Sequence, residues 1–145
     1  MKKKTYLELL LLMVITFSFT ACNIDNHDEP YLNTTEGLCS KTWAEGYTTT
    51  NNLYCTHKLS FAYNGAGQEI FIYNNVDING RPLNTIVKTE TFNFNWDWEN
   101  SNNECLILDY GNNSVLYFDN VWVRNDYLSG KLEGNNVTFR NSNTK

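Results

Sequence analysis

The sequence predicts an all-β fold in which about eight antiparallel strands follow one another as a meander. Three observations support this prediction. Aromatic and polar residues alternate strictly from Phe92 to Trp98, as in a strand with one buried face. Turn-forming pairs such as Asn79-Gly80 separate short apolar runs at even spacing. After the N-terminal apolar run, no segment has the apolar period of an amphipathic helix. The meander predicts either an up-and-down barrel or a sandwich.

The N-terminus has the features of an export signal. Three lysines at residues 2–4 precede an apolar run over 9–19, which is shorter than the about 20 residues of a transmembrane helix. Thr20 and Ala21, both small, then precede Cys22. This stretch resembles a bacterial lipoprotein signal, in which the cysteine is acylated and becomes the first residue of the mature protein. The resemblance implies a signal peptide over 1–21 and lipidation of Cys22.

Charge and composition restrict the partners. The net charge is −5 at pH 7, and the few Lys and Arg residues are scattered. Nucleic-acid binding needs clustered positive charge, so we expect no nucleic-acid partner. We expect acyl chains on Cys22, rather than surface charge, to provide the membrane anchor.

Residues 22–37 are polar and acidic, and they predict a flexible tether before the folded domain. Asp25, Asp28 and Glu29 resemble the acidic segment that follows the lipidated cysteine in lipoproteins that the Bacteroidetes send to their outer surface. The resemblance implies a lipid-anchored outer-membrane protein, with exposure at the cell surface left open. A plain solvated linker is the alternative interpretation.

The folded domain is expected over residues 38–141. Its second strand alternates well, with Cys55, His57 and Phe61 on one face. Glycine-containing turns separate most of the later strands. The predicted strands cover about 40–47, 54–63, 68–73, 92–98, 105–110, 115–123, 127–133 and 137–140.

Several short motifs in this domain resemble the lipocalin-like lipoprotein domains of the Bacteroidetes. They are Trp43, Phe61-x-x-Asn64-Gly65-x-Gly67, Phe94-x-Trp96, Leu106-x-Leu108-x-Tyr110, and the closing Leu132, Val137 and Phe139. The resemblance implies a small lipocalin-like barrel. Lys41 departs from the pattern, because a lipocalin-type signature has glycine two residues before the tryptophan. The resemblance also implies that Arg140 covers Trp43 through a cation–π contact and closes the barrel; a solvated Arg140 is the alternative.

The interior of an eight-stranded barrel is either filled by side chains or holds one small ligand. The first function hypothesis is therefore a barrel that binds a small apolar or amphipathic ligand without a cofactor. The candidate lining residues are Phe61, Phe94, Trp96 and Trp98, which the alternating pattern also predicts as core.

Two other functions fit the same sequence. The protein could be a surface module that binds glycan or protein through exposed aromatic residues, with Trp122, Tyr117 and Tyr127 as candidates. It could also be a structural or inhibitory lipoprotein with a filled core.

The sequence gives no strong sign of catalysis. Cys39, Cys55 and Cys105 are an odd number beyond the lipidation site, so they predict one disulfide with a free thiol or simply buried thiols. Cys55 and His57 share a strand face, yet no further metal ligand or orienting group accompanies them. Phosphate-binding loops, nucleophile elbows and zinc-protease helices have no counterpart. We expect neither an enzyme nor a metal site.

Overall fold

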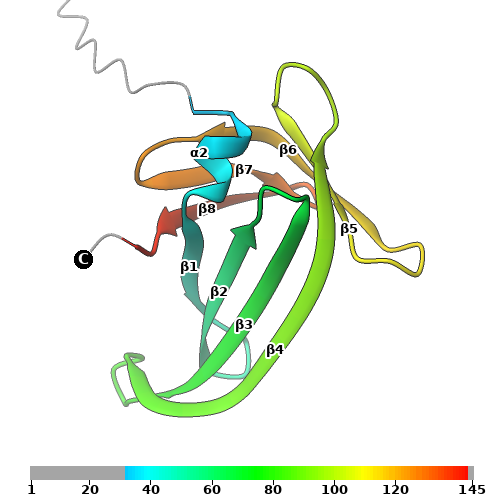
Figure 1. Cartoon of the computed structure of the whole chain (residues 1–145). Helices are drawn as coiled ribbons and strands as arrows, with labels where there is room; N and C mark the ends of the chain where they lie inside the picture. Colours follow the sequence, from blue (N-terminus) through cyan, green and yellow to red (C-terminus); the bar gives the residue numbers. More distant parts are fainter. Residues whose placement is uncertain (1–31, 144–145) are drawn as a thin grey trace, which may run out of the picture.

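The computed structural model describes residues 32–143. The predicted signal peptide, Cys22 and most of the predicted tether lie outside the described residues. Eight antiparallel strands each pair with the next, and the last pairs with the first, which closes a barrel (Figure 1). The prediction of an all-β meander that closes into a small barrel is confirmed.

The strands are β1 (Thr42–Thr48), β2 (Leu53–Phe61), β3 (Ala66–Val76), β4 (Pro82–Trp98), β5 (Cys105–Asp109), β6 (Val115–Val123), β7 (Tyr127–Leu132) and β8 (Asn135–Asn141). Most bounds agree with the predicted ranges within a few residues. The exception is β4, which begins at Pro82 instead of near residue 92. Its first half lacks apolar alternation because nearly all of its side chains are exposed.

The β3–β4 hairpin forms where the sequence predicts its turn. Gly80 has a φ of +75°, a conformation that glycine adopts without a Cβ clash. The Asp77 carboxylate accepts hydrogen bonds from the backbone N–H groups of Asn79 and Arg81, both at 2.8 Å. These bonds fix the tip of the hairpin, and residues on both sides of it then pair as strands.

A short helix, α2 (Thr35–Cys39), precedes β1 and covers one end of the barrel (Figure 1). The Thr34 hydroxyl caps it by accepting from the N–H of Gly37 at 3.0 Å, and Leu38 is fully buried. The Trp43 indole N–H donates to the carbonyl of Leu38 at 3.0 Å, which joins the helix to the core. The last residues of the predicted tether are therefore part of the fold. The helix escaped prediction because it is too short to show a period.

No helix among residues 32–143 is both long enough and apolar enough to cross a membrane.

The core lies inside the barrel, next to α2. Its largest fully buried side chains include Trp43, Phe118 and Phe139. Gly67 on β3 lies opposite Phe94 on β4, and the Phe94 ring occupies the space where a Cβ at residue 67 would stand. A glycine at this position therefore lets an aromatic ring lie flat against the sheet.

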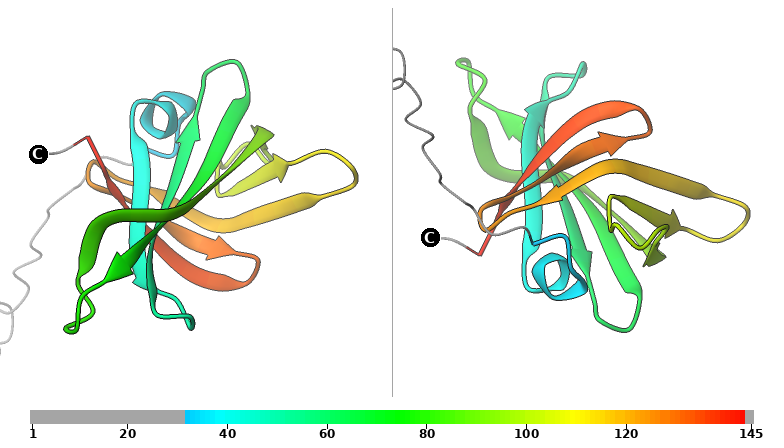
Figure 2. Two further views of the ribbon diagram at one scale, coloured as in Figure 1. Left: turned by 90° about the horizontal axis from the view of Figure 1, so that it is seen from below. Right: turned by 90° about the horizontal axis from the view of Figure 1, so that it is seen from above.

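The two halves of the barrel differ in length. Strands β1–β4 form a long curved sheet, and β5–β8 cross over the part of it near α2 (Figures 1 and 2). β8 pairs with β1 only at Trp43 and Ala44, and β5 pairs with β4 only from Asn95 to Trp98. The inward-facing side of the long sheet is consequently covered near α2 and less covered toward the β3–β4 hairpin.

Candidate functional site

A buried cluster of ionisable side chains crosses the inward-facing side of the barrel. Strand pairing places Glu45 on β1 opposite His57 on β2. The other edge of β2 pairs with β3, which carries Glu69. His57 Nδ1 lies 3.1 Å from Glu45 Oε1, and its Nε2 lies 2.7 Å from Glu69 Oε1. The Tyr110 hydroxyl, just after β5, donates to Glu69 Oε2 at 2.7 Å. We call these four residues the acid–histidine network.

The geometry favours the charged form of His57. Only the imidazolium form carries an N–H on both ring nitrogens, and both nitrogens face a carboxylate oxygen. Burial alone would lower the pKa of His57, but the hydrogen bonds to Glu45 and Glu69 outweigh burial and raise it above its ordinary value. Burial, followed by donation to Glu69, raises the pKa of Tyr110, which therefore stays a neutral donor.

Aromatic rings hold the imidazole in place. The Phe71 ring stacks on His57 with the ring centroids 4.3 Å apart, and the edge of Phe139 approaches it at 4.9 Å. Phe139 belongs to the fully buried core, whereas Phe71 is only partly buried. The network therefore lies at the boundary between the packed core and the rest of the barrel interior.

Beyond this boundary the inward-facing side meets solvent. Tyr47, Lys88 and Phe92 share the inward-facing side with the network, since pairing puts Tyr47 opposite Cys55, Cys55 opposite Tyr73 and Tyr73 opposite Lys88. Tyr47 is nevertheless 42% exposed and Phe92 45% exposed, and the Lys88 side chain is 57% exposed. We call this region, away from α2, the open end of the barrel.

Glu45 is the more exposed of the two carboxylates that hold His57. Its side chain is 21% exposed, compared with 9% for Glu69. Within residues 32–143, Glu45 uses Oε1 for His57 and no hydrogen bond engages Oε2, so this oxygen can accept from a donor at the open end.

The predicted lining residues lie mainly in the core. Phe61, Phe94 and Trp96 are between 4% and 8% exposed. Phe61 contacts both other rings at centroid distances of 5.7 and 5.6 Å, so the three side chains fill the space between them. Trp98 packs partly buried against this core, and its indole N–H has no hydrogen-bond partner within the described part of the chain.

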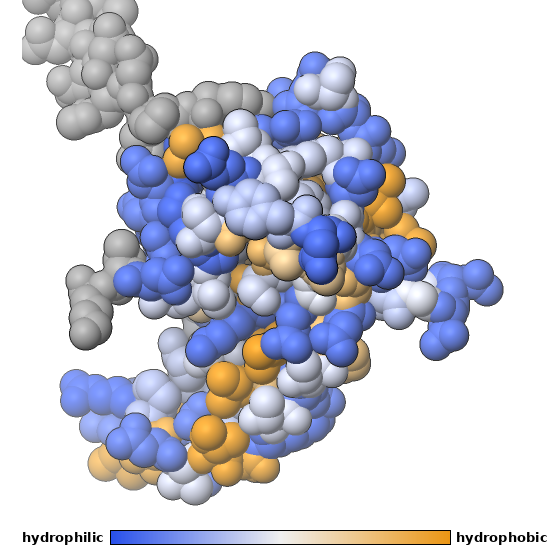
Figure 3. Space-filling view, viewed as in Figure 1, coloured by the Kyte–Doolittle hydropathy of each residue, from blue (hydrophilic) through white to orange (hydrophobic). Residues whose placement is uncertain are grey.

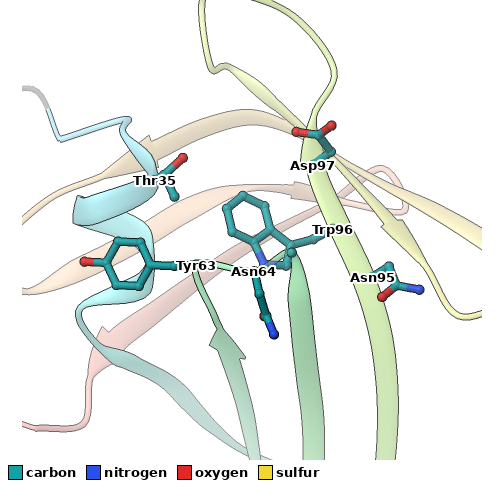
Figure 4. A pocket seen from close by; sticks show the side chains of 7 residues that line it. Thr35, Tyr63, Asn64, Asn95, Trp96 and Asp97 are labelled. Carbon is teal, nitrogen blue, oxygen red and sulfur yellow. The ribbon is translucent and has the colours of Figure 1, made fainter.

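A hollow of about 450 Å³ lies at the end of the barrel near α2 (Figure 4). Thr35 of the helix, Tyr63 and Asn64 of the β2–β3 turn, and residues 95–97 of β4 surround it. Trp96 also lines it, and the indole N–H of Trp96 donates to the carbonyls of Ala62 and Ala66, both at 3.1 Å. Its lining offers amide and carboxylate groups beside Tyr63, which is 65% exposed.

The cation over the Trp43 ring is Lys41, which directly precedes β1. β1 and β8 do pair, and Arg140 lies opposite Ala44, the neighbour of Trp43. However, the Arg140 side chain is 70% exposed and lies 3.8 Å from Asp126. Lys41 Nζ is instead 5.3 Å from the Trp43 ring centroid. The residue that departs from the lipocalin-type signature thus occupies the place over the ring.

Cys39, Cys55 and Cys105 are all free thiols. Burial raises the pKa of each, and that of Cys105 reaches about 12. His57 directs both ring nitrogens to glutamates rather than to Cys55. Among residues 32–143, no three His, Cys, Asp or Glu side chains are grouped so that they could hold a metal ion.

Two of the predicted surface aromatics are well exposed, Trp122 at 52% and Tyr117 at 47%, while Tyr127 is partly buried. The Arg124 guanidinium lies 4.6 Å from the Trp122 ring centroid and covers one face of that ring.

Sequence reasoning missed three members of the acid–histidine network. A usable signal exists, because Glu45 lies between Trp43 and Tyr47 on the inward face, where a charge is unexpected. For Tyr110 no local signal exists, since its partner Glu69 is 41 residues away.

A scan against protein-family models gave no match, and searches of curated proteins and of solved structures found no similar protein. The functional interpretation therefore depends on the residues described above.

Proposed function

We propose that this protein is a lipid-anchored barrel of lipocalin-like type that binds a small amphipathic ligand at its open end. The observation that carries the proposal is the acid–histidine network at the boundary between the core and the exposed inward-facing residues. Burying charged groups costs free energy even when they are paired, so a charged cluster inside a small barrel suggests a role beyond stability.

The lining predicts the chemistry of the ligand. Phe92 and Tyr47 offer exposed aromatic surface for an apolar body. Three carboxylates face the interior, from Glu45, Glu69 and Glu90, against the positive charges of His57 and Lys88. This local excess of negative charge favours a head group that donates hydrogen bonds, such as an amine, over a carboxylate.

A binding role fits the network better than a catalytic one. An imidazolium held between two carboxylates has no lone pair with which to accept a proton. The free thiols have raised pKa values and so exist mostly as poor nucleophiles at neutral pH. We therefore propose that the protein is not an enzyme and needs no cofactor.

A titration with three eight-carbon probes tests the proposal. The chain from Asn23 onward contains the whole barrel, and NMR can follow its binding of octylamine, octanol and octanoate. We expect octylamine to bind most tightly and Glu45→Gln to weaken it at least about tenfold. The matched control is Glu36→Gln, because Glu36 is an exposed carboxylate on α2 at the other end. Equal binding of octanoate, or no effect of Glu45→Gln, would refute the proposal.

A glycan-binding function is the second candidate, and the hollow near α2 favours it. Sugars are recognised by convergent hydrogen bonds beside an aromatic ring, and Asn64, Asp97 and the exposed Tyr63 offer both (Figure 4). Binding on a glycan array that is lost in Tyr63→Ala, but kept in Glu45→Gln, would favour this candidate over the amphipathic ligand.

A further inference from the structure

One edge of β4 is uncovered over most of its length. β3 pairs with one side of β4 from Pro82 to Asn95. β5 pairs with the other side only from Asn95 onward. In the part of the chain that the structure describes, no strand pairs with this second side between Pro82 and Phe94. A long unpaired edge exposes backbone donors and acceptors to which another strand can add.

Apolar side chains accompany this edge. Ile86 is 60% exposed, Val87 52% and Phe92 45%. Figure 3 shows apolar surface gathered over the end of the molecule formed by the β3–β4 hairpin. Short length and charges usually protect such a strand, but this stretch of β4 is long and carries only two charged residues, Lys88 and Glu90. Its bulge lies at one place, between Ile86 and Lys88. The edge therefore has both the hydrogen-bonding groups and the apolar surface of an interface.

The charges on the edge are complementary to themselves. Lys88 and Glu90 lie on either side of Thr89. When two copies of β4 pair antiparallel with Thr89 opposite Thr89, Lys88 of each copy faces Glu90 of the other. β4 is bulged between Ile86 and Lys88, so this register holds over residues 88–90 and shifts by one residue beyond the bulge. Opposite charges at directly opposed positions stabilise antiparallel strands.

We propose that the chain forms a symmetric dimer by antiparallel pairing of β4 edges, centred on Thr89. A two-fold interface requires one surface that is complementary to itself, and this register supplies it. The pairing ends before Asn95, where β5 already occupies the edge. The partner strand then lies beside the open end of the barrel, so each copy narrows the open end of the other.

Charge reversal tests the register. Lys88→Glu and Glu90→Lys each create two like-charge pairs across the two-fold axis, so each should weaken dimerisation at least about tenfold. An equimolar mixture of the two variants should restore a heterodimer, because every facing pair is then opposite in charge. Analytical ultracentrifugation of the chain from Asn23 measures both effects. Lys131→Glu is the control, since Lys131 is exposed on β7.

Cysteine cross-linking gives a second measurement that does not depend on charge. Only a residue on the two-fold axis faces itself, so Thr89→Cys should form an intermolecular disulfide readily under mild oxidation. Thr91→Cys is the matched control, because residue 91 lies away from the two-fold axis and does not face its own copy. Both threonines are exposed.

Three results would overturn the proposal. The first is a wild-type chain that remains monomeric up to about 100 μM. The second is a mixture of the two charge variants that remains monomeric although the wild type dimerises. The third is cross-linking of Thr91→Cys as rapid as that of Thr89→Cys.

Discussion

At the scale of single residues, His57 carries a charge that depends on side chains from two neighbouring strands. Glu45 and Glu69 both accept from its ring, and Tyr110 donates to the far oxygen of Glu69. With His57 protonated the network carries one net negative charge. The fold stabilises the imidazolium, and the imidazolium in turn stabilises the fold, so its titration should be visible in stability.

We predict that the stability of the protein decreases as the pH rises above about 6.5, the ordinary pKa of histidine. Because the pKa of His57 is raised in the folded state, its contribution is fully present below the unfolded value and is lost as the pH passes through the folded value. Urea unfolding at several pH values measures this slope.

His57→Gln should remove most of this slope, since glutamine does not titrate. The other histidine, His27, lies outside the described residues, and His27→Gln should keep the wild-type slope. A slope that persists in His57→Gln, or disappears in His27→Gln, would contradict the assignment.

At the scale of elements, Asn33 joins the segment before α2 to the irregular end of β6. It is 2% exposed, its amide donates to the carbonyls of Val121 and Asn103, and its oxygen accepts from the N–H of Val123 at 2.8 Å. β6 shifts register between Asp119 and Trp122, which frees backbone groups from the β6–β7 ladder. One buried side chain therefore satisfies the backbone where the strand pairing is interrupted.

We predict that Asn33→Ala destabilises the protein by about 3 kcal/mol, because it leaves several buried backbone groups without partners. Asn125→Ala should change stability by less than about 0.5 kcal/mol, since Asn125 is exposed in the β6–β7 turn. Chemical unfolding measures both values. Similar losses in the two variants would show that the contacts of Asn33 contribute little.

The sequence predicts these elements well where one face is buried. Alternation in β2 and at the end of β4 and turns such as Asn79-Gly80 give the strand order, and the barrel follows. The sequence predicts poorly where both faces of a strand are exposed to solvent, as in β4 before residue 92. It also predicts poorly where an element is as short as α2. The acid–histidine network depends on register between strands, which a local pattern does not contain.

At the scale of the whole molecule, the barrel has two different ends. α2 and the residues that lead into it cover one end, and the open end and the β3–β4 hairpin lie at the other (Figure 1). Lipidation at Cys22 would place the anchor on a stretch of ten residues, 22–31, that spans at most about 35 Å when extended. The anchor would then join the molecule at its closed end, leaving the open end free to face away from the membrane.

We predict that Cys22→Ala moves the protein out of the membrane fraction and blocks cleavage of the signal. Acyl chains on Cys22 would supply the membrane affinity, and a net charge of −5 offers no electrostatic substitute on an anionic surface. Fractionation and intact mass measure the two effects. The control is Cys39→Ala, which should remain in the membrane fraction. An unchanged distribution of Cys22→Ala would contradict the lipoprotein assignment.

The seam between β1 and β8 sets when this barrel can be completed. Only Trp43 and Ala44 pair across it, supported by two bonds from Ser142 to the carbonyl of Thr42. The joined residues are 100 positions apart, so the ring stays open until its last strand has been synthesised. Pairing of the residues around Asn141 and Ser142 with the start of β1 is therefore the contact that completes the ring.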